Sequence, residues 1–420
     1  MEQSPILLHP YQVPGRTPNL RVARGQGSLV YDDAGREYID AAAGLWNLGL
    51  GLGNKGILKA MAEQGEALAY FGLFDATHGP AERLAALLVQ LTESRMGHVY
   101  FSTTGTSAIE VALRTARTYQ RAAGRPGKIR ILSYDEGYHG CSWMNLSSSG
   151  SMHAEMNGWE DPLPDFRTIA NPADEARSLA ELRRAVEEEG DRLAALLIEP
   201  ILGTGGIIVP SPGYFSELAA ICREHDILIV SDEVATGCGR TGAMFASYQL
   251  GLEPDLIAVS KGLAAGYFPI GATLIRGAIV ETMRSAGAPI LFGSTQDGNP
   301  IGCAAALAAL NQILSENLHV RAAEIGARIK EGLQPLVGSS VLGEIRGMGL
   351  MIGLDLTHTG AVPRPFSEQE AAQARALCAD SGLLVYHYRS GLSLYPALTI
   401  SEEEVDDMID ILTSVISLLA

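Results

Sequence analysis

The sequence predicts an α/β fold in which helices cover a mostly parallel β-sheet. Short apolar runs alternate with amphipathic segments through the middle of the 420-residue chain, which is typical of alternating strands and helices. Hydrophobic residues make up 47% of the sequence and charged residues 19%, so the chain can bury a large core. The pattern changes near residue 300, where a long alanine-rich helical stretch begins. We therefore expect a large α/β domain followed by a smaller α+β domain.

Five apolar runs are predicted to be buried strands, because parallel strands covered on both faces are nearly continuously hydrophobic. They lie at residues 129–133, 194–198, 227–231, 256–260 and 272–275. A helix is predicted at residues 211–225, with Ser211 as its cap and Pro212 in its first turn.

The last third of the chain predicts further helices and strands. Residues 300–336 read as a long helical stretch, and the glycine-interrupted apolar residues 341–356 suggest strands. A closing helix is expected after Ser401, because Glu404 follows at capping-box spacing. The expected parts are an N-terminal segment that packs with the small domain (1–50), the large domain (51–300) and the small domain (301–420).

Charge and cysteine content narrow the function classes. Acidic residues exceed basic ones by 48 − 31 = 17, and a field of that sign repels phosphate backbones, so no nucleic-acid partner is expected. The five cysteines are scattered and form no CxxC pair, which argues against a disulfide scaffold and a structural zinc site. We expect no metal site, and a reducing, cytoplasmic location.

No targeting or membrane segment is expected. Residues 1–5 contain no basic stretch leading into an apolar one, so no signal peptide is predicted. The uncharged run at residues 262–275 is shorter than the roughly 20 residues that a spanning helix needs.

Lys261 is the most suggestive of only five lysines, because it directly follows the predicted strand 256–260. Open α/β sheets bind ligands at the carboxyl ends of their strands. A partly desolvated lysine there has a lowered pKa and can form a Schiff base. Taken alone, the residue fits an ordinary surface lysine better.

Asp232 follows the preceding strand, residues 227–231, and strengthens the interpretation of Lys261. A carboxylate at this point can pair with a protonated ring nitrogen and keep a cofactor electron-withdrawing. By itself, Asp232 is as consistent with a loop cap or a metal ligand. Together with Lys261 it predicts a pyridoxal-phosphate site.

Two further segments suit such a cofactor. Thr104, Gly105 and Thr106 precede an amphipathic helix, and hydroxyls and N–H groups at a helix N-terminus bind a dianion, although a plain helix cap explains them equally well. Tyr138 lies after the strand 129–133 and could stack on a conjugated ring, with a loop aromatic as the alternative. The neighbouring His139 fits a general base or a packed histidine.

The separated motifs together resemble those of the class III pyridoxal-phosphate aminotransferases, which have fold type I. The resemblance extends from about Tyr31 to the C-terminus. Its motifs are Thr104-Gly105-Thr106, Tyr138-His139-Gly140, Glu199-Pro200, the run from Asp232 to Gly242, Ser260-Lys261-Gly262, and Thr295 to Pro300. The combination is highly specific, although no single piece is.

The resemblance implies a role for each motif. Lys261 would be the Schiff-base lysine and proton shuttle, and Asp232 would hold the pyridine nitrogen. Tyr138 would stack on one ring face and Val234 would pack on the other. The remaining cofactor-site residues would be Thr104, Gly105, Thr106, His139, Glu199 and Thr295. Thr295 would reach the phosphate of a neighbouring subunit, because sites in this family lie at a homodimer interface.

Departures from the family pattern bear on the substrate. The ornithine and GABA branch binds a carboxylate with an arginine that a glutamate masks, and those positions hold Ser393 and Thr204 here. Gly44-Leu45-Trp46 resembles the early pocket motif of the ω-transaminase (amine:pyruvate) branch, with an ordinary core residue as the alternative for Trp46. That branch carries a mobile arginine where this chain has Tyr386. Arg389, three residues on, could swing in to meet a carboxylate or could equally be a solvent-exposed arginine. We therefore expect a small-molecule amine or amino sugar and a carbonyl acceptor as substrates, with Trp46, Tyr138, Tyr386 and Arg389 at the substrate.

Two alternatives remain at this stage. Family relatives with the same cofactor act as epimerases, aminomutases or decarboxylases. Residues 51–56 also fit G-x-G-x-x-G, the pattern of nicotinamide dehydrogenases, but no convincing strand precedes them.

Overall fold

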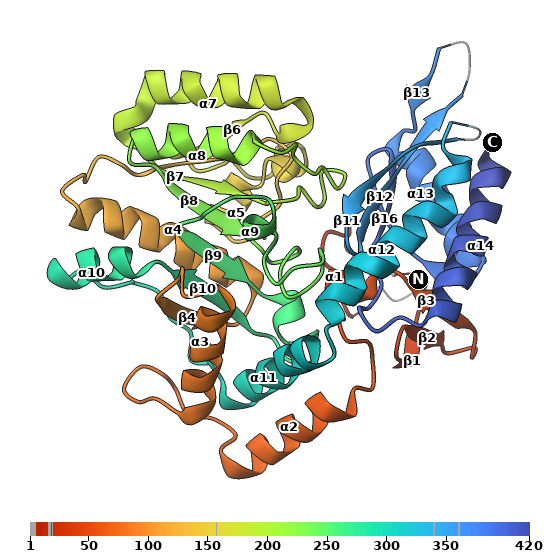
Figure 1. Cartoon of the computed structure of the whole chain (residues 1–420), viewed down its shortest axis with the longest axis horizontal. Coiled ribbons are helices and arrows are strands. Elements are labelled where there is room, and N and C mark those ends of the chain that lie inside the picture. The colour runs from red at the N-terminus through yellow and green to blue at the C-terminus, as the bar shows by residue number, and fades with distance from the viewer. Residues whose placement is uncertain (1–5, 16–17, 19, 157, 339–340, 360–361) are drawn as a thin grey trace.

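A computed structural model describes residues 6–15, 18, 20–156, 158–338, 341–359 and 362–420. Three β-sheets and the helices around them make up this part of the chain (Figure 1). Residues 1–5, on which the absence of a signal peptide was predicted, lie outside it. No helix within the described residues has the length and apolar character needed to cross a membrane.

A seven-stranded sheet forms the centre of the larger part of the molecule. Its order is β4 (His98–Ser102), β10 (Gly271–Ile275), β9 (Leu256–Val259), β8 (Leu228–Asp232), β7 (Leu193–Ile198), β5 (Arg130–Tyr134) and β6 (Phe166–Ile169). All five predicted strands are confirmed to within one residue at each end, whereas β6 was not predicted. Only β10 runs antiparallel to its neighbours in this sheet, so the prediction of a mostly parallel sheet is confirmed.

Helices cover both faces of this sheet (Figure 1). On one face, α7 (Glu175–Glu189) and α8 (Tyr214–Glu224) pack against side chains such as Leu196 and Ile229. On the other, α4 (Gly105–Ala122) and α10 (Gly277–Ser285) pack against alternate residues of the same strands. The alternation follows from the two-residue period of a strand.

The prediction that Ser211 caps a helix is wrong. The helix α8 begins at Tyr214, after Gly213 in a left-handed conformation. The Ser211 hydroxyl instead donates to Glu175 Oε2 at 2.6 Å. An acidic acceptor on the neighbouring helix α7 thus competes successfully with the local capping interaction.

Two smaller sheets lie beside each other at one end of the molecule (Figure 1). The first contains β1 (Val22–Gln26), β2 (Leu29–Asp32), β3 (Glu37–Asp40) and β14 (Leu383–Leu384). The second contains β11 (Leu342–Met348), β12 (Met351–His358), β16 (Gly391–Leu394) and β15 (Tyr386–Tyr388), and β13 (Arg364–Pro365) pairs with β12. Because β14 pairs with β3, a C-terminal strand completes the N-terminal sheet. The predicted domain boundaries themselves stay predictions.

The helical stretch predicted at 300–336 is interrupted. It forms α11 (Pro300–Ser315) and α12 (Leu318–Leu333), separated at Asn317, whose φ of 51° is left-handed. The first of these helices packs on α2 (Lys55–Ala67) and α3 (Gly79–Leu91). The predicted strands after residue 341 and the closing helix α14 (Glu402–Leu419), with Ser401 as its cap, are confirmed.

The remaining helices are short or lie at the periphery. They are α1 (Ala43–Trp46), α5 (Trp143–Ser148), α6 (His153–Met156), α9 (Ala246–Gln249) and α13 (Glu368–Asp380). Because α1 rather than a strand precedes residues 51–56, the strand context that a dinucleotide-binding loop requires is missing. Short 3₁₀ turns occur at Gly150–Met152, Pro172–Asp174, Gly190–Arg192, Lys261–Leu263 and Gln334–Leu336.

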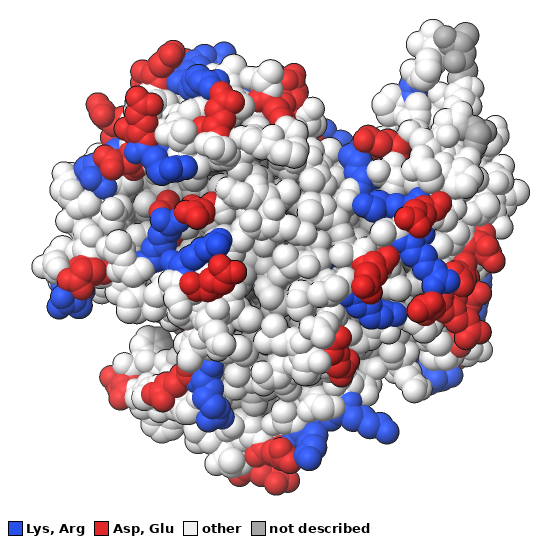
Figure 2. Space-filling view, in the orientation of Figure 1, with Lys and Arg blue, Asp and Glu red and all other residues white. Residues whose placement is uncertain are grey.

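Charged side chains of both signs are dispersed over the surface. On the face in Figure 2 they occupy mainly the outer parts, whereas the area between the large sheet and the C-terminal helices carries few of them. The acidic excess of 17 is thus not gathered into one patch on this face.

Candidate active site

The predicted site residues come together at one edge of the large sheet. The strands β4, β5, β7, β8 and β9 run in the same direction, so their carboxyl ends meet there. Thr104, Tyr138, Glu199 and Lys261 follow β4, β5, β7 and β9, respectively, and Asp232 is the last residue of β8. A parallel sheet therefore gathers residues that are far apart in the sequence.

Asp232 is held by two hydrogen bonds at the end of β8. Its Oδ2 lies 2.8 Å from His139 Nδ1, and its Oδ1 accepts a bond from the backbone N–H of Val234 at 3.0 Å. Both Asp232 and His139 are buried, and His139 Nε2 has no hydrogen-bond partner within the described residues. The histidine thus fixes the carboxylate rather than standing free as a general base.

Glu199 anchors the backbone of two neighbouring loops. Its Oε1 accepts from the Tyr138 N–H at 3.1 Å, and its Oε2 accepts from the Gly203 N–H at 2.9 Å. Burial raises the pKa of Glu199 from 4.5 to about 7, with the nearby Asp232 charge adding to the rise and His139 opposing it. The carboxyl group therefore changes its charge near neutral pH.

We expect Glu199 to make the stability of the protein depend on pH. A carboxyl whose pKa is higher in the folded state binds its proton more tightly there, so the free energy of unfolding falls as pH rises from 4.5 to about 7. The variant Glu199→Gln lacks this dependence. Between pH 4.5 and about 7, the free energy of unfolding of the wild type should fall by up to about 3 kcal/mol relative to that of the variant. Plots of Tm against pH for the two proteins should therefore not run parallel. Parallel curves between pH 5 and pH 8 would contradict the raised pKa.

Lys261 begins a short 3₁₀ turn after β9 and has a φ of 39°, which is unusual for a residue with a side chain. Burial lowers the pKa of its amine and Arg240 lowers it further, whereas Asp232 and Glu199 oppose this shift. The Nζ atom lies 4.9 Å from the centre of the Trp46 ring. A larger fraction of this amine is therefore neutral than for an exposed lysine.

The N-terminus of α4 provides two free backbone donors. The Thr104 hydroxyl accepts from the Ser107 N–H at 3.1 Å, so it acts as the helix cap. The N–H groups of Gly105 and Thr106 have no partner among the described residues, and the helix dipole favours an anion at this point. A phosphate group fits this arrangement.

Gly105 also allows Val234 to approach. A Cβ on Gly105 would lie 2.9 Å from Val234 Cγ1, so only glycine fits without displacement. Gly140 shows the same feature, since a Cβ there would lie 2.3 Å from Thr106 Oγ1. The glycines therefore keep the phosphate loop, Val234 and the loop after β5 in close contact.

Trp46 lies at the centre of an aromatic cluster. It stacks on Tyr395 with ring centres 4.2 Å apart, and Tyr386 meets it edge-on at 5.4 Å. A Cβ on Gly203 would lie 3.1 Å from the Trp46 ring, which places Trp46 beside the Glu199 loop. The structure thus brings Trp46 next to Lys261 and Tyr386 next to Trp46.

Arg389 and Thr295, unlike the buried Asp232 and Glu199, are exposed residues. The Arg389 guanidinium pairs with the Glu136 carboxylate, and its side chain is 66% exposed. Burial raises the pKa of Glu136, and Arg389 opposes this rise. Thr295 is exposed, and its carbonyl accepts from the Tyr70 hydroxyl at 2.7 Å. Its predicted contact with a neighbouring subunit concerns a second chain and stays a prediction.

Sequence reasoning missed three residues at the site. Asn145 is buried and its amide donates to the carbonyls of His139, at 2.6 Å, and Thr106, at 3.1 Å, which ties the stacking loop to the phosphate loop. Arg240 is buried, donates to the Leu350 carbonyl at 3.1 Å and helps to lower the pKa of Lys261. Tyr11 contacts Tyr138. Arg240 stood in the motif quoted for the resemblance, whereas no sequence signal pointed to Tyr11.

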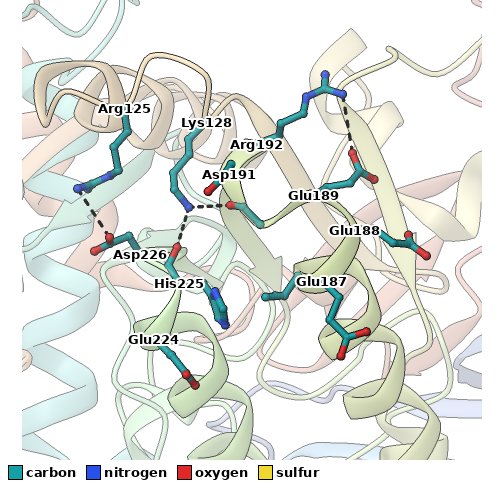
Figure 3. A pocket seen from close by; sticks show the side chains of 12 residues that line it. Arg125, Lys128, Glu187, Glu188, Glu189, Asp191, Arg192, Glu224, His225 and Asp226 are labelled. Atoms are coloured by element: carbon teal, nitrogen blue, oxygen red, sulfur yellow. Dashed lines mark hydrogen bonds and ion pairs between the residues drawn. The ribbon is translucent and has the colours of Figure 1, made fainter.

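A separate polar depression of about 590 Å³ lies elsewhere on the molecule (Figure 3). Its floor contains Lys128, whose Nζ donates to the carbonyls of Gly190, Leu193 and His225 at 2.9, 3.2 and 2.6 Å. These bonds join the chain just after α7 and α8. Because they use all three ammonium donors, we assign Lys128 a structural role.

The arrangement fits pyridoxal phosphate in its residues. It offers a lysine with a lowered pKa and, at the end of β8, a carboxylate held by a histidine. It also offers the free N-terminus of α4, which can bind an anion, and a valine packed closely against a glycine. When bound, this cofactor supplies an aldehyde that captures an amine and a ring that withdraws electrons. The fold and the site together define a pyridoxal-phosphate enzyme of fold type I.

Comparison with known proteins makes the class specific. Residues 11–416 match the family described as aminotransferase class-III. A probable mitochondrial gamma-aminobutyrate transaminase 2 from Oryza sativa subsp. indica is 33% identical over 412 residues, covering 93% of this chain and 83% of the relative. The chain therefore belongs to the class III aminotransferase family.

Solved structures agree with this assignment. A PLP-bound amine transaminase from an uncultivated Pseudomonas species superimposes with a TM-score of 0.94 at 33% identity, with both chains fully covered. A thermostable (S)-enantioselective omega-transaminase from Thermomicrobium roseum gives a TM-score of 0.92 at 33% identity, covering 98% of this chain and 96% of the other. The predicted fold, the cofactor and the aminotransferase class are thus confirmed, and the dehydrogenase interpretation is not supported.

Proposed function

We propose that this aminotransferase takes its amino group from a primary amine whose remainder is uncharged, and passes it to a carbonyl acceptor. The observation that carries the proposal is the environment of Lys261. Its amine has a lowered pKa and lies against the ring of Trp46. The positions at which the two branches of the family carry a carboxylate-binding arginine hold Ser393 and Tyr386 in this chain. Small-molecule amine and carbonyl substrates suit this environment.

The proposed roles follow from the positions of the side chains. Lys261 Nζ, whose pKa is lowered by burial, would bind the cofactor aldehyde and would carry the substrate proton. Asp232, fixed by His139, would keep the ring nitrogen protonated. Tyr138 and Val234 would hold the two ring faces, and the first turn of α4 would bind the phosphate.

The two positions that distinguish the carboxylate-binding branch hold neutral hydroxyls. Ser393 on β16 and Thr204 after β7 are residues whose hydroxyl oxygens are buried and lack a hydrogen-bond partner in the described structure. The indole nitrogen of Trp46 and the hydroxyl of Tyr395 are also buried and without a partner there. Groups of this kind suit a neutral, hydroxylated or apolar substituent better than a carboxylate, which prefers an arginine fork.

Absorbance titration of the purified holoenzyme with a panel of amines tests this proposal. An amine, an amino sugar and an amino acid should each be added without a carbonyl acceptor. We expect the neutral amines to convert the cofactor to its amino form and release a carbonyl product. Racemisation, rearrangement or loss of CO₂ without this conversion would favour an epimerase, an aminomutase or a decarboxylase instead.

Arg389 and Glu136 give two predictions of opposite sign for the KM of an amino-acid donor. Arg389→Ala should raise the KM for any amino-acid donor about fivefold, the equivalent of roughly 1 kcal/mol for one exposed ion pair, and leave the KM for a neutral amine unchanged. Glu136→Gln should lower the KM for the amino acid, because it releases the guanidinium that Glu136 holds in the free protein. Steady-state kinetics with matched donors checks both. Unchanged values in both variants would remove Arg389 from the site.

We also propose a homodimer that shares its active sites. An exposed apolar group supports this proposal, with Tyr70, Phe71, Phe74 and Leu291 exposed by 45%, 54%, 69% and 76%. Tyr70 bonds to the Thr295 carbonyl, so this group adjoins the residue expected to reach a partner's phosphate site. Light scattering measures the oligomeric state.

We also propose a cytoplasmic location, which rests on the unpaired cysteines.

A further inference from the structure

The described N-terminal strap, residues 6–15, is bonded to the rest of the protein through one side chain. Within the described residues, the strap's hydrogen bonds to other parts of the chain all involve the Tyr11 hydroxyl. This hydroxyl donates to Cys141 Sγ at 2.9 Å and lies 3.3 Å from the Tyr138 hydroxyl. Tyr11 is itself 67% exposed, and other side chains of the strap, such as Ile6 and Leu8, are largely exposed as well. Tyr11 is therefore its polar attachment point.

The attachment point lies beside the residues assigned to the substrate. Burial raises the pKa of Tyr11, the bond to Cys141 adds to the rise, and the nearby Tyr386 phenol contributes a further increment. Tyr11 thus contacts Tyr138, in the loop after β5, and interacts electrostatically with Tyr386 on β15. Tyr386 contacts Trp46 edge-on, and Lys261 Nζ lies 4.9 Å from the centre of the Trp46 ring. The strap is thus attached to a loop residue that is assigned to the substrate.

Cys141 marks the solvent side of this arrangement. It is exposed, whereas His139, two residues earlier, is buried. The four other cysteines are all buried. The chain therefore reaches the surface between His139 and Cys141, and Tyr11 contacts Tyr138 and Cys141 on this exposed side.

We propose that Tyr11 is a specificity-determining residue, because its hydroxyl latches the N-terminal strap to Tyr138 and Cys141 and so limits the bulk of the amine that reaches Lys261. The inference rests on the proposed function. The wild-type enzyme should therefore prefer compact amines. Loss of the Tyr11 hydrogen bonds should let larger amines reach Lys261.

Substrate selectivity gives the first test. The ratio of kcat/KM for bulky benzhydrylamine to kcat/KM for compact isopropylamine should rise about fivefold in Tyr11→Phe holoenzyme, the equivalent of one lost hydrogen bond. The matched control is Tyr31→Phe, which removes a hydroxyl that donates to Glu37 at 2.6 Å on the N-terminal sheet. The control should keep the wild-type ratio. An unchanged ratio in Tyr11→Phe overturns the inference.

Labelling of Cys141 gives a readout that does not depend on turnover. Native holoenzyme treated with dithiobis(nitrobenzoate) should show one reactive thiol per chain, because the other cysteines are buried. Its labelling rate should rise severalfold in Tyr11→Phe and stay constant in Tyr31→Phe. An equal rate in wild type and Tyr11→Phe would show that no latch covers the thiol.

Substitution of Cys141, which accepts the hydrogen bond of Tyr11, tests whether that bond rather than the size of the side chains sets the selectivity. Cys141→Ser retains an acceptor for the Tyr11 hydroxyl and should keep a selectivity close to the wild type, whereas Cys141→Ala should behave like Tyr11→Phe. Combining Tyr11→Phe with Cys141→Ala should add little to either change alone. Additive effects contradict the latch. A wild type that converts neither amine contradicts the proposed function, which is a different outcome from conversion with unaltered selectivity.

Discussion

Replacing Lys261 with alanine is expected to lower kcat by about 10³-fold or more. The substitution removes both the amine that binds the cofactor and the base that moves the substrate proton. No other lysine can take over, because the remaining four are Lys55, Lys59, Lys128 and Lys330, and none follows a strand at this edge of the sheet. Steady-state rates with the preferred amine measure the effect.

An exposed lysine provides the control for this prediction. Lys59 lies on α2, where it forms a solvent-exposed pair with Glu63 at 3.7 Å. Lys59→Ala should retain the wild-type kcat and Tm. If Lys261→Ala also kept its activity while folding normally, the assignment of the site would be wrong.

The second large effect concerns Asp232. Asp232→Asn should lower kcat by about 10²- to 10³-fold, the range found when one preorganised electrostatic group is removed. The asparagine oxygen still accepts from the Val234 N–H, so the backbone after β8 keeps its bond. The negative charge that holds a proton on the ring nitrogen is lost. The expected result is therefore a change in kcat with little change in Tm.

A matched aspartate keeps this test specific. Asp226 precedes the same strand β8, is 65% exposed and lies 3.9 Å from Arg125. Its φ of 51° is one that asparagine tolerates. Asp226→Asn should therefore leave kcat unchanged. Comparable losses in both variants would point to a general effect of charge rather than to a contact with the cofactor.

The sequence predicted the parts of the fold that depend on local patterns. Buried parallel strands are continuous apolar runs, and the polar residues that end them, Asp232 and Lys261, were therefore visible as candidates. The capping box at Ser401 was also local. The order of the strands was not predictable in this way, because it depends on which runs pair after the chain has crossed over the sheet.

The contacts that sequence reasoning missed join residues far apart in the chain. Arg389 pairs with Glu136, 253 residues away, and Tyr11 bonds to Cys141, 130 residues away. No motif spacing or periodicity in the sequence indicates either contact, because only the packing of the small sheet and the N-terminal strap brings the partners together. The break at Asn317 was missed because the left-handed residue lies in an otherwise helical pattern.

We expect one particular amine, that of Lys261, to be covalently joined to pyridoxal phosphate in the holoenzyme. Borohydride reduction of the holoenzyme followed by peptide mass spectrometry locates that bond among the five lysines. We predict a single phosphopyridoxyl modification, on Lys261. A modification on any other lysine, or none in protein that carries the cofactor, would contradict the account.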